Sequence, residues 1–180
     1  YQATVDLIAS ANASRAKNKP ISAGDAGSEM LRRIEEQVTA EKPHGVTTGL
    51  EYLDKIIGGL RKTDLLILAG RPSMGKTALA TGVAWNVASQ GYKVAFFSLE
   101  MSAGQLVQRI LSAESEILLE KIARGKLEEH EMKQLYAKGI QRLAKAPMFI
   151  DDTAALNIFE LRAKCRRLKN KHNIGLIIID

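Results

Sequence analysis

The chain has only one cysteine and no long apolar run, and each of these two features argues against a class of protein. With Cys165 as its only thiol, the 180-residue chain cannot form an internal disulfide, so we expect a reducing, cytoplasmic setting. No apolar run approaches the roughly 20 residues that span a bilayer, so we expect no membrane partner. No signal peptide is visible, and because the first residue is Tyr1 rather than Met, we expect a piece of a longer protein.

Metal-ligand spacings and repeats are scarce as well. His44, His130 and His172 are far apart in sequence, and no Cys/His spacing typical of a zinc site occurs. No internal repeat or low-complexity tract is visible. The net charge of +6 permits a nucleic-acid partner without requiring one. The composition, 46% hydrophobic and 26% charged residues, is typical of a globular domain with its own core.

The most informative feature that is present is a glycine loop between an apolar segment and a helical pattern. Residues 64–69, with the sequence DLLILA, predict a buried strand, and the apolar residues of 79–88 share one broad helical face. Between them lies an octapeptide that fits GxxxxGK[ST], the phosphate-binding P-loop. Its residues are Gly70, Arg71, Pro72, Ser73, Met74, Gly75, Lys76 and Thr77, and Ala78 follows. The order of strand, glycine loop and helix is the context that this motif requires.

The residue types in this loop suit a nucleotide triphosphate. The start of a helix leaves several N–H groups unpaired and carries partial positive charge, so it attracts phosphate. Gly70 and Gly75 let the backbone curl around the phosphate without a Cβ in the way. Lys76 brings a mobile charge to the β- and γ-phosphates, and the Thr77 hydroxyl is placed to ligate Mg²⁺. Pro72 removes one donor and stiffens the loop.

Two carboxylates are candidates for the chemistry beside such a loop. Asp180 follows four large apolar residues, so with a P-loop upstream it fits the Walker B position, which orients the Mg²⁺ shell opposite the loop threonine. Glu100 follows another apolar strand at its carboxyl end, the edge where α/β sheets place ligands. It is either the base that takes a proton from the attacking water or a loop carboxylate beside the next helix. The residues alone leave both interpretations of Glu100 open.

From residue 43 onward, strand patterns alternate with helical ones, which predicts an α/β fold with a parallel sheet and helices on both faces. Strands are expected at 93–99, 147–150 and 174–179, the last one buried, and helices at 50–57, 103–111, 116–145 and 157–171. Ser102 is the expected cap of the second helix, and the third is expected to break near Gly125. Trp85 and Cys165 are expected to pack in the core, with adenine stacking the alternative for Trp85. The basic residues of 162–171 are expected to form a solvated helix face, with a DNA-binding helix as the alternative.

Two further stretches carry expectations of their own. In residues 1–42, Tyr1, Val5 and Ile8 share a helical face, 20–28 predict a flexible link, and a second short helix follows Ser28 as its N-cap. Neither helix can bury its apolar stripe without a neighbour. At 151–152, two aspartates end a strand, which favours a turn or helix cap over a second metal carboxylate.

Several motifs together resemble the replicative DNA helicases of the DnaB family. They are GRPSMGKTA at 70–78, FSLEM at 97–101, IDDT at 150–153, GLIIID at 175–180, and the Thr-Gly, Leu-Asp and Gly-Gly-Leu groups of 48–60. The resemblance is dense over 43–180 and implies a RecA-like P-loop NTPase core. It implies that Glu100 is the general base for ATP hydrolysis, that Lys76 and Thr77 are the P-loop pair, and that Asp180 is the Walker B aspartate.

The resemblance also implies what the parent protein does and what it meets. Such proteins form rings, most simply hexamers, and couple ATP hydrolysis to 5′–3′ movement on single-stranded DNA. They meet a primase and a helicase loader at bacterial replication forks. Residues 1–42 resemble their helical linker, which docks on the adjacent subunit. Family members continue past the Walker B strand with DNA-binding loops, a glutamine sensor and an arginine finger, so 43–180 would be a partial ATPase domain. The alternatives are a RecA- or RadA-like recombinase and a non-catalytic nucleotide-binding or oligomerisation module.

Overall fold

The computed structural model describes residues 22–39 and 45–180. By its internal contacts the chain divides into two units, Tyr1–Lys42 and Pro43–Asp180, and each is treated by itself. In the first unit the structure describes the helix α2, Ala23–Thr39. The helical face expected from Tyr1, Val5 and Ile8 lies outside the described residues. Among the described residues, no helix has both the length and the apolar character needed to cross a bilayer.

Helix α2 begins earlier than the sequence predicts. The Ser22 hydroxyl accepts a hydrogen bond from the backbone N–H of Asp25 at 3.1 Å and donates to the Asp25 carboxylate at 2.8 Å, as a helix cap does. Ser28 lies inside the helix, where its hydroxyl donates to the carbonyl of Gly24 at 3.0 Å. The predicted N-cap at Ser28 and the flexible link through 22–28 are therefore wrong. A local serine–aspartate cap outweighs the low helix propensity of the glycines.

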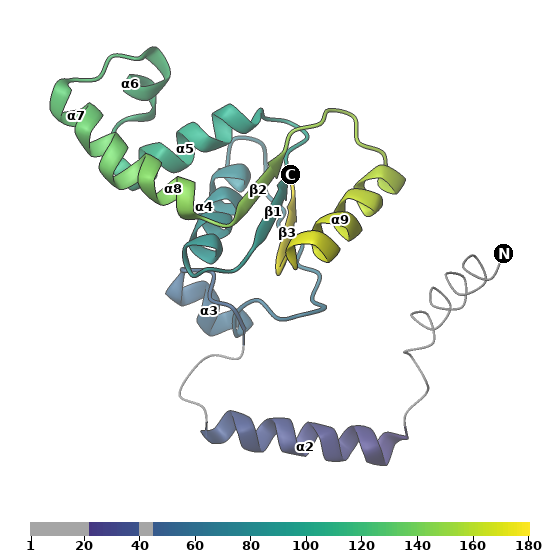
Figure 1. The fold of residues 1–180 in the computed structure, drawn as a ribbon. Coiled ribbons are helices and arrows are strands. Elements are labelled where there is room, and N and C mark those ends of the chain that lie inside the picture. The colour runs from purple at the N-terminus through teal and green to yellow at the C-terminus, as the bar shows by residue number, and fades with distance from the viewer. Residues whose placement is uncertain (1–21, 40–44) are drawn as a thin grey trace. The chain divides into compact units, whose positions relative to one another are not determined.

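The second unit alternates helices and strands (Figure 1). Its elements are α3 (Glu51–Ile57), α4 (Lys76–Ser89), β1 (Val94–Phe97), α5 (Ala103–Ser115), α6 (Leu119–Arg124), α7 (Glu129–Gln134), the π-helix η1 (Leu135–Ile140), α8 (Gln141–Lys145), β2 (Met148–Asp151), α9 (Ile158–His172) and β3 (Leu176–Ile179). Ser102 caps α5 through a capping box with Gln105, and Gly125 ends α6 in the left-handed conformation, as predicted.

The described strands form one parallel sheet in the order β2-β1-β3. The central strand β1 is buried along its whole length, which suits its sequence VAFF. The edge strand β3 alternates between half-buried and exposed residues, with Ile177 41% and Ile179 53% exposed. The prediction of a strand at 174–179 is correct and the prediction of its burial is wrong, because the α4 face covers Leu176 and Ile178 while nothing in the described residues buries the opposite face, which carries Ile177 and Ile179.

Helices cover both faces of the sheet, as the sequence predicts. On one face Val94 and Phe96 of β1 pack against Ala84, Val87 and Leu106, which come from α4 and α5. On the other face Ala95 and Phe97 form a cluster with partly buried residues of α9. These α9 residues are Leu161, Cys165 and Leu168. The expectation that Cys165 packs in the core is confirmed, and burial raises the pKa of its thiol.

The strand predicted at 64–69 is not present. The segment has no strand hydrogen bonds and its side chains point to solvent, with Leu65 85% and Ile67 84% exposed. An apolar segment becomes a strand only where a neighbouring strand offers its N–H and C=O groups. In the described part of the chain no strand of the β2-β1-β3 sheet pairs with this segment. The sequence therefore shows that 64–69 is apolar, but it does not show whether a neighbouring strand is available to pair with this segment.

Candidate functional site

The predicted phosphate loop forms a tight turn into the N-terminus of α4. Gly75 stands at the N-cap with φ 87°, and Ser73 has φ 64°, both in the left-handed region that favours glycine. The Met74 N–H donates to the carbonyl of Arg71 at 3.2 Å, which closes the turn. A Cβ at Gly70 would lie 3.3 Å from Cγ of Lys76, a tight contact that the lysine side chain would have to relieve by a small shift.

This loop borders a hollow of about 460 Å³. Its lining residues are Leu68, Ala69, Gly70, Arg71, Met74, Gly75, Lys76 and Leu79. Lys76 and Thr77 are half-buried, whereas Met74 is 74% exposed. Because no side chain within the described residues caps the first turn of α4, its N–H groups remain available to a ligand in the loop. The arrangement can hold an anion between backbone donors and a lysine.

Helix α4 is oriented by the parts of the chain on either side of it. The short connection 90–93 sends the chain back into β1, so the N-terminus of α4 lies toward the edge where β1 ends (Figure 1). Asn86 donates from its side chain to the carbonyl of Thr48 at 2.9 Å, and Gln90 donates to that of Thr47 at 3.0 Å. These two bonds fix the segment before α3 against the helix that carries the loop.

The 47–49 segment is itself held by Asp54, the aspartate of the Leu-Asp group. One carboxylate oxygen accepts from the backbone N–H and the hydroxyl of Thr48, at 2.9 and 2.8 Å, and the other accepts from the Thr47 hydroxyl. Burial alone would raise the pKa of Asp54, but these hydrogen bonds outweigh it and hold that pKa below its ordinary value. The Thr-Gly and Leu-Asp groups are therefore structural parts of one turn.

Asp180 lies at the carboxyl edge of the sheet, directly beside the end of β1. Its N–H donates to the carbonyl of Phe97 at 3.0 Å, and its carbonyl accepts from the N–H of Leu99 at 2.7 Å. Its side-chain oxygen Oδ2 is buried and has no hydrogen-bond partner within the described residues. A buried carboxylate oxygen without a partner is costly unless something else binds it. This oxygen is therefore the strongest indication of a ligand in the structure.

Glu100 lies in the loop that leads from β1 to α5, on the same edge of the sheet. Its side chain is exposed, whereas Ser98 before it is buried and accepts a hydrogen bond from the N–H of Met101 at 3.2 Å. The bond from Leu99 to the Asp180 carbonyl places the two candidate carboxylates on neighbouring strand ends. The structure therefore brings Glu100 and Asp180 to one edge, as the sequence pattern predicts.

The side chains of the loop and of this edge are not linked by polar contacts in the described part of the chain. In the stretches 22–39 and 45–180 no hydrogen bond or ion pair joins Lys76 or Thr77 to Glu100 or Asp180. In these same residues no group of three or more His, Cys, Asp or Glu side chains is arranged to hold a metal ion. A metal bound here would need further ligands from a phosphate or water, which is the ordinary situation of Mg²⁺ in nucleotide sites.

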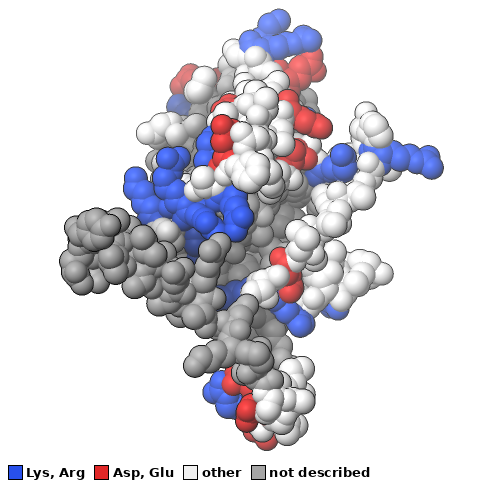
Figure 2. Space-filling model, turned by 90° about the vertical axis from the view of Figure 1, so that its right-hand side faces the viewer, with Lys and Arg blue, Asp and Glu red and all other residues white. Residues whose placement is uncertain are grey.

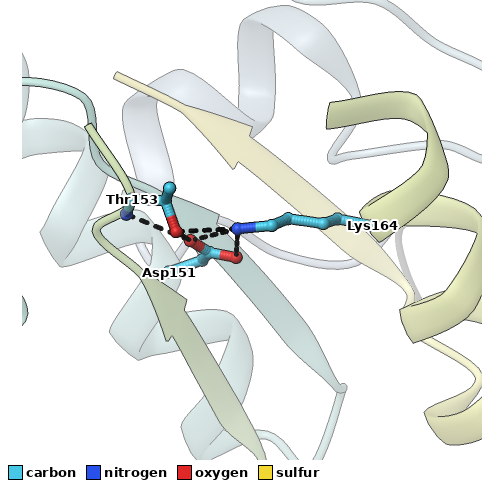
Figure 3. A network of polar contacts seen from close by, with 3 residues as sticks. All are labelled: Asp151, Thr153 and Lys164. Atoms are coloured by element: carbon cyan, nitrogen blue, oxygen red, sulfur yellow. Dashed lines mark hydrogen bonds and ion pairs between the residues drawn. The ribbon is translucent and has the colours of Figure 1, made fainter. Parts of the chain in front are cut away.

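Asp151, the last residue of β2, and Asp152, which follows it, have separate structural roles. Asp151 accepts two hydrogen bonds from Nζ of Lys164, at 2.7 and 2.9 Å, and one from the Thr153 hydroxyl at 2.6 Å (Figure 3). Asp152 accepts from the N–H of Ala103, at the start of α5, at 2.8 Å. Burial alone would raise the pKa of Asp151, but the Lys164 and Thr153 bonds outweigh it and lower that pKa. The predicted turn is observed at Asp151, whose carboxylate also accepts from the N–H of Thr153, whereas Asp152 caps a helix distant in sequence and not α9, which Asn157 caps.

Basic residues gather on α9. Figure 2 shows a cluster of Lys and Arg side chains on the face of the molecule that carries this helix. The exposed basic side chains include Arg162, Arg166 and Arg167, whereas Lys164 is bound to Asp151 and Lys169 donates to the carbonyl of Ile174. The apolar side of α9 packs on the sheet, so these arginines form a solvated face, as the sequence predicts.

The chain matches a known family and known proteins over most of its length. The model of the DnaB-like helicase C terminal domain matches residues 45–180. The replicative DNA helicase DnaB of Geobacillus stearothermophilus is 42% identical over 153 residues, which is 84% of this chain and 32% of that protein. The replicative DNA helicase DnaC of Bacillus subtilis is 44% identical over 137 residues, which is 76% of this chain and 30% of that protein. The chain thus spans about a third of the length of these relatives.

Solved structures give the same result for the fold. One solved ATPase domain superposes with a TM-score of 0.80 at 26% identity, over 90% of this chain and 57% of that one. A DnaB-like replicative helicase, studied with its interactions with primase, superposes with a TM-score of 0.78 at 26% identity, over 99% of this chain and 43% of that one. These likenesses confirm the predicted RecA-like α/β core and the resemblance drawn from the motifs.

Proposed function

The chain belongs to the family of DnaB-like helicase C-terminal domains, and on that premise we propose that it forms the ATP-binding part of a replicative DNA helicase. The parent protein would couple ATP hydrolysis to movement along single-stranded DNA and to unwinding of the duplex. The observation that carries this proposal is the pairing of a phosphate loop at the N-terminus of α4 with the buried, unpartnered Oδ2 of Asp180. Both features lie toward the edge where the strands end.

Different residues of the loop would hold different parts of the nucleotide. The backbone N–H groups of 70–78 would surround the β-phosphate, with Gly70 and Gly75 giving the close approach. Lys76 would place its charge against the β- and γ-phosphates. The Thr77 hydroxyl and the Asp180 carboxylate would hold Mg²⁺ together with phosphate oxygens. When bound, that ion would neutralise charge that develops on the transferred phosphoryl group.

Glu100 would act as the general base. Its exposed carboxylate, on the loop beside Asp180, is free to accept a proton from a water molecule aligned with the γ-phosphate. The alternative role, a carboxylate that only complements the α5 dipole, gains no support from the hydrogen bonds of that helix. At the N-terminus of α5, the N–H groups of Gln105 and Ala103 already donate to the side chains of Ser102 and Asp152.

Lys76→Ala tests the nucleotide site directly. In the natural full-length protein we expect this change to lower ATP affinity and turnover by at least about a hundredfold, because a charge at the β- and γ-phosphates is lost. Binding of a fluorescent ATP analogue with magnesium and steady-state hydrolysis measure the two effects. Lys138→Ala, at an exposed position of η1, is the matched control and should behave as the wild type. Unchanged ATP binding in the Lys76 variant would refute the nucleotide site.

Glu100→Gln separates binding from chemistry. We expect ATP affinity close to that of the wild type and hydrolysis lower by about two to four orders of magnitude, on the order of the contribution of a general base. Glu116→Gln at the far end of α5 is the control for loss of one exposed carboxylate. Hydrolysis at the wild-type rate in the Glu100 variant would show that Glu100 is not the general base, and it would not contradict the proposed nucleotide-binding site.

The wider assembly follows from the same family membership. We propose a homo-oligomeric ring, most simply a hexamer, with a primase, a helicase loader and single-stranded DNA as partners at bacterial replication forks. On α2, Met30, Leu31 and Ile34 are 54%, 63% and 41% exposed. This apolar stripe is what a linker helix would present to an adjacent subunit. The 1–42 segment is accordingly proposed as the docking segment and 43–180 as part of the ATPase domain.

A recombinase of RecA or RadA type, or a module that binds nucleotide without catalysis, is the competing proposal. ATPase activity with and without single-stranded DNA distinguishes the catalytic options from the non-catalytic one. Unwinding of a forked duplex, as opposed to strand exchange, separates helicase from recombinase. The mass in solution, measured by light scattering, tests the ring. Strand exchange without unwinding would overturn the helicase proposal.

A further inference from the structure

The end of β2 is tied to the start of α5 by one side chain. Asp152 follows the last residue of β2, and its Oδ2 accepts a hydrogen bond from the backbone N–H of Ala103 at 2.8 Å. Ala103 is the first residue of α5 and follows Glu100 after only two residues. The two residues that share this bond are 49 positions apart in sequence, so the bond joins separate parts of the fold.

The rest of the Glu100 loop is also held by hydrogen bonds, in addition to the packing of Met101 against the core. On the strand side, the N–H of Leu99 donates to the carbonyl of Asp180 at 2.7 Å, although the Leu99 side chain is 45% exposed. Within the loop, the N–H of Met101 donates to the Ser98 hydroxyl. Because these contacts are polar and directional, they determine where the backbone on each side of Glu100 lies.

Asp152 supplies the contact on the helix side. The ladder between β1 and β2 ends with the Ser98 N–H donating to the Asp151 carbonyl at 2.9 Å, so Asp152 leaves the sheet beside the beginning of the loop. Its carboxylate then bridges to the N-terminus of α5, where a negative charge is favourable. The loop is thus closed between β3 on one side and the β2 segment on the other.

We propose that Asp152 is a positioning residue for Glu100. This inference rests on the proposed role of Glu100 as general base. The contact that Asp152 makes is with α5 and not with the loop that would bind phosphate. It acts by holding the start of α5 at a fixed place relative to the strand ends, so that the Glu100 carboxylate reaches the attacking water at the required angle. A shift of about 1 Å in such a group is enough to cost about a hundredfold in rate.

The test compares Asp152→Ala with Asp152→Asn in the natural full-length protein. Alanine removes the acceptor, so we expect kcat for ATP to fall on the order of ten- to a hundredfold while KM and the affinity for a fluorescent ATP analogue stay unchanged. Asparagine keeps an oxygen acceptor and should restore most of the lost kcat. A direct readout accompanies this one, because the Ala103 amide should exchange its hydrogen faster in the alanine variant than in the asparagine variant.

Two further variants make the outcome unambiguous. Lys164→Met breaks the adjacent Asp151 pair without touching α5, and it should leave kcat unchanged at temperatures well below unfolding. Glu100→Gln tests the proposed function itself. If Glu100→Gln abolishes hydrolysis while Asp152→Ala matches the wild type, the positioning role is overturned and the proposed function stands. If Asp152→Asn and Lys164→Met lose as much kcat as Asp152→Ala, the effect is general loosening of the β2 end, which also overturns it.

Discussion

At the scale of single residues, the pair of Asp151 and Lys164 shows how a short motif stabilises the edge that carries the site. Their side chains are only 25% and 23% exposed, and Lys164 reaches across from α9 to the end of β2 (Figure 3). The Thr153 hydroxyl donates to the same carboxylate. A charged pair with several hydrogen bonds and limited exposure contributes more than an exposed one. The pair therefore joins α9 to the sheet.

Lys164→Met tests this contribution. We expect a loss of about 1–2 kcal/mol in the free energy of unfolding at neutral pH, measured by urea denaturation. The pKa of Asp151 is lower in the folded chain than its ordinary value of 3.8, so the stabilisation is present above about pH 4 and is lost as the pH falls further. The difference between variant and wild type should therefore shrink near about pH 3. Lys171→Met in the exposed last turn of α9 is the control, and equal losses in both variants would contradict the role of the pair.

At the scale of elements, the sequence predicts helix ends and strands that depend on neighbouring residues. It does not predict features that depend on contacts between residues far apart in sequence. The helix cap at Ser102, the glycine stop after α6 and the strand β1 depend on residues close together in sequence, and all are observed. The bridge from Asp152 to Ala103 could not be predicted, because it depends on how β2 and α5 meet in space. The segment 64–69 has a strand-like sequence, but its pairing depends on a neighbour that the pattern does not specify.

Substitution in 64–69 tests whether that segment contributes to the core of this chain. Because the Ile67 side chain is 84% exposed, Ile67→Asp should change the free energy of unfolding by no more than about 0.5 kcal/mol. Phe96→Ala, at a fully buried position of β1, should cost about 3–5 kcal/mol and serves as the positive control. Urea denaturation of the 180-residue chain measures both. A cost of several kcal/mol for Ile67→Asp would mean that 64–69 is a buried strand after all.

At the scale of the whole molecule, the unit Pro43–Asp180 is organised around α4. This helix carries the phosphate loop at its N-terminus, packs on β1 in its middle and holds the 47–48 segment through Asn86 and Gln90. Its Trp85 is 5% exposed and donates to Glu114 of α5 at 2.5 Å, and Glu114 in turn pairs with Arg142 of α8. The predicted packing role of Trp85 is confirmed. One helix thus connects the site to most of the unit.

Because these contacts all lie within 43–180, that unit should fold without residues 1–42. We expect the chain that begins at Pro43 to unfold in urea at the same midpoint as the 180-residue chain, within about 0.5 kcal/mol in the free energy of unfolding. The fluorescence of Trp85, the single tryptophan, reports the transition, since unfolding exposes a ring that is buried against α5. Trp85→Phe in the same shortened chain should remove the signal and confirm its origin. A clearly lower midpoint for the shortened chain would mean that residues 1–42 stabilise the second unit, and it would contradict the division at 42/43.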